Sequence, residues 1–223
     1  MKNIFCNIVA VTMAAITLSG CGGLNAVLAE RQETVEMYHI FDIKTLSKPD
    51  AVIKGAADGL ARNTNSIVQS RPLQMNAQVP ITPGRFELVS MADMFKGSNI
   101  GNLMGAAGTS PMRMAKCDNA LWNSKATRSI TGSNNLTMYS CLYQYKGGYH
   151  LDIYAVFQKV SGGAFGVARE AASAIVGSPE QWVNKTIVDT VRSIESAAAT
   201  KVIHIEGQPE IGELPMVDKL TLK

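Results

Sequence analysis

Three histidines are the residues of this chain best suited to proton transfer, and one has a carboxylate close by in sequence. His39, His150 and His204 all fall in segments whose alternating pattern predicts strands. His150 and Asp152 are two residues apart, so on a strand they share one face and an imidazole–carboxylate contact is sterically possible. A hydrolase would also need a nucleophile, but Ser140 falls on the opposite face and no Gly-x-Ser-x-Gly motif is present. We therefore assign no catalytic residue.

Metal and cofactor sites find even less support in the sequence. A zinc site needs three or four ligands, whereas His150 and Asp152 supply two. Asp189 and Glu195 are six apart on an expected helix and would not share a face. The eleven methionines form no tight array that indicates copper. The glycine-rich stretch 97–111 lacks the Gly-Lys-Ser/Thr that closes a phosphate loop. We expect no metal site and no cofactor.

Aromatic residues give a stronger signal, because four of the six tyrosines fall on one face of one expected hairpin. Tyrosine offers a broad contact area at low entropic cost and is common at binding surfaces. Such a face could bind a partner protein or stack on the sugar rings of peptidoglycan. The candidate partner-binding residues are Tyr139, Tyr143, Tyr145, His150, Asp152 and Tyr154. The alternative is that segment 85–120 of the same chain covers this face, and Cys141 on that face favours the covered interpretation.

The hairpin that carries this face is predicted from two alternating segments, 136–146 and 149–159, joined by Gly147-Gly148. Two glycines suit a type I′ turn, in which both central residues have positive φ. That turn would set Lys146 opposite Tyr149, and the pairs that follow would be Tyr145–His150, Tyr143–Asp152 and Cys141–Tyr154. The opposite face of the hairpin collects Met138, Leu142, Leu151, Ile153, Ala155 and Phe157.

The remaining elements follow from periodicity and capping signals. Strands are expected over 36–44, 66–71, 85–91 and 201–206. Helices are expected over about 14 residues after Ser47, over 164–176, and over about 20 residues after Ser178-Pro179-Glu180-Gln181, which fits a capping box with Pro at the first helical position. Segments 72–83 and 97–111 are expected to be loops, with a small-residue helix as the alternative for the second.

These elements predict an α+β fold, in which an antiparallel sheet with a Gly-Gly hairpin packs against helices. Two β-α-β-type units are possible, over 34–91 and 115–206. Together they would form one α+β domain over 34–206, preceded by a tether over 21–33 and followed by a loose tail over 207–223.

The N-terminal segment has the pattern of a secretory signal. Lys2 precedes a short apolar run from Ile8 to Leu18, and small residues follow. The run is shorter than the roughly 20 residues that span a bilayer. Leu18-Ser19-Gly20-Cys21 resembles the lipobox of bacterial lipoproteins. The resemblance implies that residues 1–20 are a signal peptide removed before Cys21, and that Cys21 carries a diacylglycerol and an N-terminal acyl chain such as palmitate. A cleaved soluble product and an uncleaved anchor are the alternatives.

The resemblance also implies a location. Gly22 and Gly23 follow Cys21, without the Asp that in enterobacterial lipoproteins usually means retention at the inner membrane. We expect an outer-membrane lipoprotein facing the periplasm, with the inner membrane as the alternative. Cys6 then leaves with the signal and Cys21 takes the lipid, so Cys117 and Cys141 remain as an even pair in an oxidising compartment. They predict a disulfide, with two reduced buried thiols or a redox pair as alternatives.

The composition of the chain limits the classes of partner that it is expected to bind. The chain has 223 residues, is 46% hydrophobic and 17% charged, and carries a net charge of +3, with no cluster of basic and aromatic residues. Nucleic acid is therefore not an expected partner. We expect a non-catalytic binding or assembly component of an envelope complex, such as a secretion, conjugation or barrel-assembly machine. The alternatives are an envelope hydrolase that uses His150 and Asp152, and a small-ligand carrier.

Overall fold

The computed structural model describes residues 29–72, 78–90, 113–129, 135–163 and 177–213, together with residues 93, 166, 168 and 171. Within this part of the chain, six strands form one sheet in the order β2-β5-β6-β7-β1-β8, and β3 pairs with β4. The strands are β1 (Arg31–Ile43), β2 (Ser66–Ser70), β3 (Glu87–Ser90), β4 (Arg113–Lys116), β5 (Trp122–Arg128), β6 (Leu136–Tyr145), β7 (Gly148–Ser161) and β8 (Val202–Gln208). The helices are α3 (Pro49–Ala61) and α7 (Pro179–Ala198).

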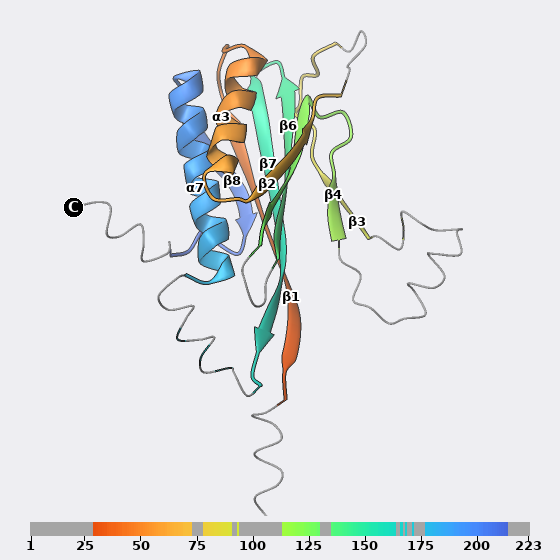
Figure 1. Ribbon diagram of the computed structural model, residues 1–223. Coiled ribbons are helices and arrows are strands. Elements are labelled where there is room, and N and C mark those ends of the chain that lie inside the picture. The colour runs from red at the N-terminus through yellow and green to blue at the C-terminus, as the bar shows by residue number, and fades with distance from the viewer. Residues whose placement is uncertain are drawn as a thin grey trace, which may run out of the picture.

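The fold is α+β with an antiparallel sheet, as predicted, because every neighbouring pair of strands runs antiparallel. Both helices lie on one face of the sheet, and the β3–β4 pair lies on the other (Figure 1). The main core fills the space between sheet and helices, where the apolar side chains of the alternating strands meet the apolar stripes of the helices. Its largest fully buried members include Trp122, Met37, Leu142 and Phe157.

The chain order explains why the two possible sub-units share one sheet. β1 lies between β7 and β8, while β2 forms the opposite edge of the sheet, next to β5. The segment from β1 through α3 to β2 therefore spans the face of the sheet over strands that come later in the sequence. Segments 34–91 and 115–206 are interleaved, and neither forms a sheet of its own.

Two glycines on α3 allow the helices to pack closely. A Cβ on Gly59 would lie 2.3 Å from Cα of Thr190, and one on Gly55 would lie 2.8 Å from Cα of Ile194. α3 therefore has no space for a side chain at either position. Its predicted cap at Ser47 is wrong: the N-cap is Lys48, without a side-chain cap. The hydroxyl of Ser47 instead donates to the backbone carbonyl of Ala198, at the end of α7 (3.0 Å).

The start of α7 agrees with its sequence signal. Ser178 is the N-cap, its side chain accepts from the N–H of Gln181, and the side chain of Gln181 accepts from the N–H of Ser178. Pro179 occupies the first helical turn, where its missing N–H costs nothing. The predicted apolar stripe of α7 is buried at Val183, Ile187, Ile194 and Ala198, and Val191 packs at its margin.

The predicted register of the β6–β7 hairpin is wrong by two residues. Tyr145 faces Gly148, Tyr143 faces His150, Cys141 faces Asp152 and Tyr139 faces Tyr154. The turn residues are Lys146 and Gly147, and neither has positive φ, so the turn is not type I′. Gly148 instead begins β7 at φ 142°, where a Cβ would lie 2.2 Å from the carbonyl oxygen of Ile43. The tertiary contact with β1 therefore decides which glycine enters the strand. Because the register shifts by two residues, each side chain keeps its predicted face.

Several segments differ from their predicted limits. β1 begins at Arg31, inside the interval predicted as tether, and pairs there with the end of β7 (Arg31 with Ser161). The sequence pattern predicts neither β4 nor β5. For β5, the reason is that Trp122–Arg128 is largely polar and carries few of the residues that favour strands. The predicted signal peptide, segment 97–111, most of helix 164–176 and residues 214–223 of the tail lie outside the described residues.

Candidate functional site

The tyrosine-bearing face of the hairpin is largely covered by another part of the chain. Tyr143, Tyr154 and Asp152 are almost fully buried, at 2%, 1% and 1% exposure. Tyr139, Tyr145 and His150 are partly exposed. A second apolar cluster forms here, made up of Ala120, Cys141 and Tyr143 with Phe86, Ala115 and Cys117 packed against it. We call residues 78–90 and 113–120 the covering segments.

A disulfide attaches one covering segment to the sheet, as predicted. Cys117, just after β4, is bonded to Cys141 on β6, with their Cα atoms 5.5 Å apart. Two surface ion pairs attach the covering segments to other strands: Arg85 pairs with Glu206 on β8, and Arg113 pairs with Glu36 on β1. The cover is therefore held both covalently and electrostatically.

Asp152 lies beneath this cover and serves as an acceptor for it. The backbone N–H of Phe86 donates to Oδ2 of Asp152 at 3.0 Å. Burial raises the pKa of Asp152 to about 7, although this hydrogen bond and the charge of Arg85 act in the opposite direction. Burial, reinforced by the negative charge of Asp152, also raises the pKa of Tyr143 well above its ordinary value. This interior favours neutral groups.

The carboxylate beside His150 is Asp42, on the neighbouring strand β1. Nε2 of His150 lies 3.9 Å from Oδ1 of Asp42, to which the hydroxyl of Tyr145 donates at 2.7 Å. Burial and the hydrogen bond to Asp42 raise the pKa of Tyr145 to about 12. Burial lowers the pKa of His150, and the positive charge of Arg85 adds to this, while Asp42 opposes it. The β1–β7 register sets Asp42 opposite His150 and thereby decides this contact.

A second histidine contact has no counterpart in the sequence analysis. Nδ1 of His39 lies 3.2 Å from Nε2 of His204, across the β1–β8 pair. Burial, followed by the charge of His204, lowers the pKa of His39 to about 4. His39 packs over Gly207, where a Cβ would lie 2.1 Å from the His39 ring. The sequence places both histidines in strands but carries no sign that those strands are neighbours.

A shallow hollow of about 270 Å³ lies beside the cover, at the outer strands of the sheet. Tyr139 of β6, Lys125 of β5 and Val68 of β2 line it together with Cys117 of the disulfide. Nζ of Lys125 lies 5.9 Å from the centre of the Tyr139 ring, within reach of a cation–π contact. Among the predicted partner-binding residues, Tyr139 is the one that lines this hollow. The hollow offers a cation, an aromatic ring and an exposed apolar side chain.

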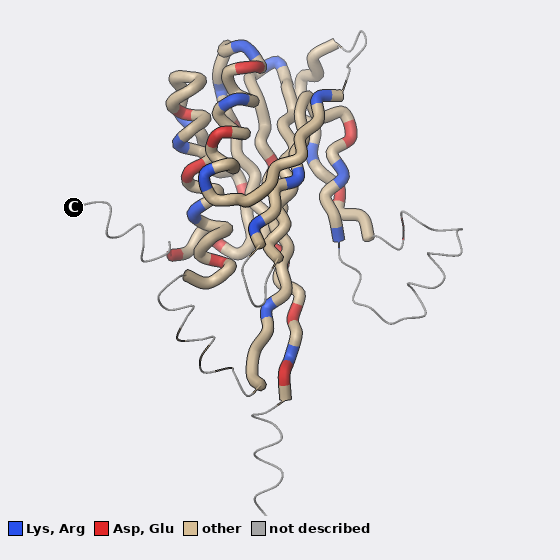
Figure 2. The backbone as a smooth tube through the Cα atoms, in the orientation of Figure 1, with Lys and Arg blue, Asp and Glu red and all other residues tan. Residues whose placement is uncertain are grey.

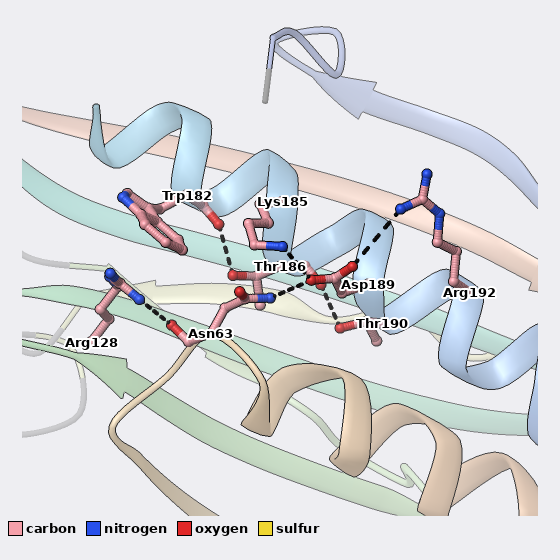
Figure 3. A network of polar contacts seen from close by, with 8 residues as sticks. All are labelled: Asn63, Arg128, Trp182, Lys185, Thr186, Asp189, Thr190 and Arg192. Atoms are coloured by element: carbon pink, nitrogen blue, oxygen red, sulfur yellow. Dashed lines mark hydrogen bonds and ion pairs between the residues drawn. The ribbon is translucent and has the colours of Figure 1, made fainter. Parts of the chain in front are cut away.

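A separate polar network joins the two helices (Figure 3). Oδ2 of Asp189 on α7 accepts from the side-chain amide of Asn63 and from Nζ of Lys185, at 2.8 and 2.9 Å. Arg128 donates to the backbone carbonyl of Asn63, and its guanidinium lies 3.6 Å from the centre of the Trp182 ring. Burial raises the pKa of Asp189, but the hydrogen bonds from Asn63 and Lys185 outweigh it and lower that pKa overall. The network connects the end of α3 to α7 and β5.

Metal ligands do not converge in the described part of the chain, where no three His, Cys, Asp or Glu side chains form a group that could hold an ion. Among the same residues, no helix is long and apolar enough to cross a membrane.

Comparison with known proteins adds little. No protein-family model matches the chain, and no curated protein matches it. One solved structure with some likeness is an uncharacterized protein from Rhizobium leguminosarum. It is 13% identical, the match covers 75% of this chain and 99% of that chain, and the TM-score is 0.28. A likeness at this level supports no inference about function.

Proposed function

We propose that this protein is a lipid-anchored lipoprotein of the bacterial envelope that acts as a binding or assembly component of an envelope complex. Cys21 of Leu18-Ser19-Gly20-Cys21 carries the lipid, and the domain faces the periplasm from the outer membrane. Gly22 and Gly23 after Cys21 support this location over the inner membrane.

The proposal rests on two observations: the Cys117–Cys141 disulfide in the structure and the lipobox-like sequence Leu18-Ser19-Gly20-Cys21. Structural disulfides persist in oxidising compartments and are rare in the cytosol. Export and lipidation bring the chain to such a compartment, and the bond then holds the covering segments on the sheet. Acylation with three chains would provide stable membrane attachment, since one chain gives only marginal binding.

The partner surface we favour is the hollow beside Tyr139. Tyr143, Tyr154 and Asp152 lie under the cover and cannot reach a partner while it is in place. Tyr139 and Lys125 remain accessible and offer an aromatic ring and a cation. An aromatic ring and a cation together could bind a partner protein of the envelope. The sugar rings of peptidoglycan are the alternative ligand, because they would stack on the ring of Tyr139.

Lipidation is tested by labelling cells with a fatty-acid probe. The wild-type chain should take up the label and fractionate with membranes, and Cys21→Ser should do neither. Cys6→Ser is the matched control and should label normally, because Cys6 is removed with the signal. A wild-type protein that retains residues 1–20, or that carries no label, would overturn the proposed anchor.

Partner binding is tested by placing a photo-crosslinking residue at position 139. Crosslinking should capture one envelope protein, and the same residue at the exposed position Asp58 on α3 should not. Lys125→Glu should weaken the crosslink from position 139. Equal capture from both positions would remove the hollow from the proposal.

A small-ligand carrier is a second candidate, favoured by the hollow itself. Native mass spectrometry of the protein purified from cells would show a bound mass, whereas a hollow that serves only as a protein-binding surface predicts none.

A further inference from the structure

Four loops meet at the end of the sheet where β1 finishes. The hydroxyl of Thr200 donates to the carbonyl of Lys44 (2.8 Å), the hydroxyl of Tyr149 donates to the carbonyl of Ser47 (2.8 Å), and the N–H of Lys146 donates to the carbonyl of Pro80 (2.9 Å). These bonds connect loops 44–48, 78–82, 146–147 and 199–201. We call this set of loops the tip.

The tip exposes apolar side chains on ordered backbone. Leu46 is 100% exposed and Ile81 is 75% exposed. The turn that carries Leu46 is fixed on both sides, because Thr45 and Ser47 are hydrogen-bonded to each other and Ser47 also donates to the carbonyl of Ala198. A loop held in this way presents Leu46 to solvent without any covering contact.

The same loops carry an excess of positive charge. The exposed lysines of the tip are Lys44, Lys48, Lys146 and Lys201. Three acidic groups near the tip in the described chain are already engaged. Asp50 pairs with Arg71, Asp42 accepts from Tyr145 and lies 4.0 Å from Nζ of Lys44, and Glu195 accepts from the N–H of Val202. Figure 2 shows basic segments at the end of the sheet opposite the start of β1, together with an acidic segment at the start of α3.

We propose that the tip binds an anionic bilayer surface. Leu46 and Ile81 would enter the headgroup region while the four lysines contact lipid phosphates, the combination that holds interfacial segments at membranes. The apolar residues protrude from the loops and are flanked by cations. A fluid bilayer accommodates such a protruding shape, and its negative charge complements the lysines.

The position of the tip implies which bilayer it contacts, and this step rests on the proposed lipid anchor. The 13 residue steps from Arg31, at the start of β1, to Lys44 at the tip span about 43 Å. The ten residues from Cys21 to Arg31 reach about 36 Å at most. A domain standing upright on its tip would therefore hold Arg31 further from that bilayer than the tether to Cys21 reaches. The tip therefore faces away from the anchoring membrane, towards a second anionic surface.

Vesicle clustering tests this directly. The purified lipoprotein is loaded by its own acyl chains into phosphatidylcholine vesicles, and acceptor vesicles with or without phosphatidylglycerol are added. We expect clustering with the anionic acceptors alone, and clustering should weaken as salt rises. Lys44→Gln with Lys48→Gln should weaken binding about 25-fold, at about fivefold for each lysine. Leu46→Ser should weaken it about tenfold or more.

Matched controls separate the tip from general charge and apolarity. Ile205→Ser and Lys159→Gln alter an exposed apolar residue of β8 and an exposed lysine of β7 away from the tip, and both should cluster acceptors as the wild type does. Loaded vesicles that ignore anionic acceptors, or tip variants that cluster them normally, would overturn the proposal. If the protein fails to load, the anchor is wrong, and co-sedimentation of the same protein with anionic vesicles then tests the tip by itself.

Discussion

At the scale of single residues, Asp152 is a carboxyl group kept from water beneath the cover. Its pKa is raised to about 7 by burial, so the fold favours the protonated form. The stability that this preference provides is complete below about pH 4, the ordinary pKa of Asp, and is lost as the pH rises to about 7. The folded protein therefore carries the cost of an ionised Asp152 at neutral pH.

Replacing Asp152 with asparagine tests this coupling. The new side chain keeps an acceptor oxygen for the N–H of Phe86 but cannot ionise. Above pH 7, we expect the free energy of unfolding of Asp152→Asn to exceed that of the wild type by up to about 4 kcal/mol. The difference should shrink as the pH falls towards 4. Urea denaturation at several pH values measures it, with the exposed Asp50→Asn as control. A constant offset at all pH values would contradict the raised pKa.

His39 should have the opposite pH dependence. Its pKa is lowered to about 4 by burial and by the charge of His204. Above about pH 6.5 both folded and unfolded chains carry a neutral His39, and the stability is complete; it is lost as the pH falls to about 4, because the unfolded chain alone takes up a proton.

His39→Asn should remove this loss. Between pH 6.5 and pH 4, the unfolding free energy of the variant should fall by up to about 3 kcal/mol less than that of the wild type. Thermal or urea denaturation across this range measures the difference. His204→Asn removes the neighbouring charge but leaves His39 buried, so its curve should lie between the other two. Parallel curves for His39→Asn and wild type would be inconsistent with the assignment.

At the scale of elements, the contact between α3 and α7 depends on the absence of a side chain at Gly59. Gly59→Ala would stabilise an isolated helix by about 1 kcal/mol. In this fold the new Cβ would lie 2.3 Å from Cα of Thr190, which is backbone and cannot turn away. The clash should win, and we expect a loss of about 2–4 kcal/mol in unfolding free energy. Asp58→Ala, at the exposed neighbouring position, should change stability little; a Gly59→Ala protein as stable as wild type would exclude the close packing.

At the scale of the whole molecule, the disulfide connects the sheet to the covering segments, which also pack on the sheet through the small apolar cluster around Tyr143. The bond closes a loop of 24 residues in sequence separation, which should stabilise the fold by roughly 3 kcal/mol in the chain-entropy model. Cys117→Ala with Cys141→Ala should lose about that amount in urea denaturation. A reductant should destabilise the wild type to a similar extent and leave the double variant unchanged. Equal stability with and without the bond would mean that the apolar cluster around Tyr143 and the ion pairs of Arg85 and Arg113 hold the cover without the disulfide.

Local chemistry in the sequence is enough for the α+β class, the capping box of α7, the face assignment of the hairpin and the Cys117–Cys141 disulfide. The capping box depends on residues that are neighbours in the chain, and the face assignment depends on an alternation of period two. The disulfide follows from the number of cysteines left in the mature chain. β5 escapes prediction because Trp122–Arg128 is polar and becomes a strand through its pairing with β2 and β6.

The tertiary structure alone decides which side chains meet. Whether His150 contacts Asp42 or Asp152 depends on the β1–β7 register, and the meeting of His39 with His204 depends on β8 adding to β1. Burial of Tyr143 and Asp152 depends on a segment about 60 residues away along the chain folding over the sheet. A sequence pattern reports the face on which a side chain lies, but contacts between distant segments are selected by the packing energy of the complete fold.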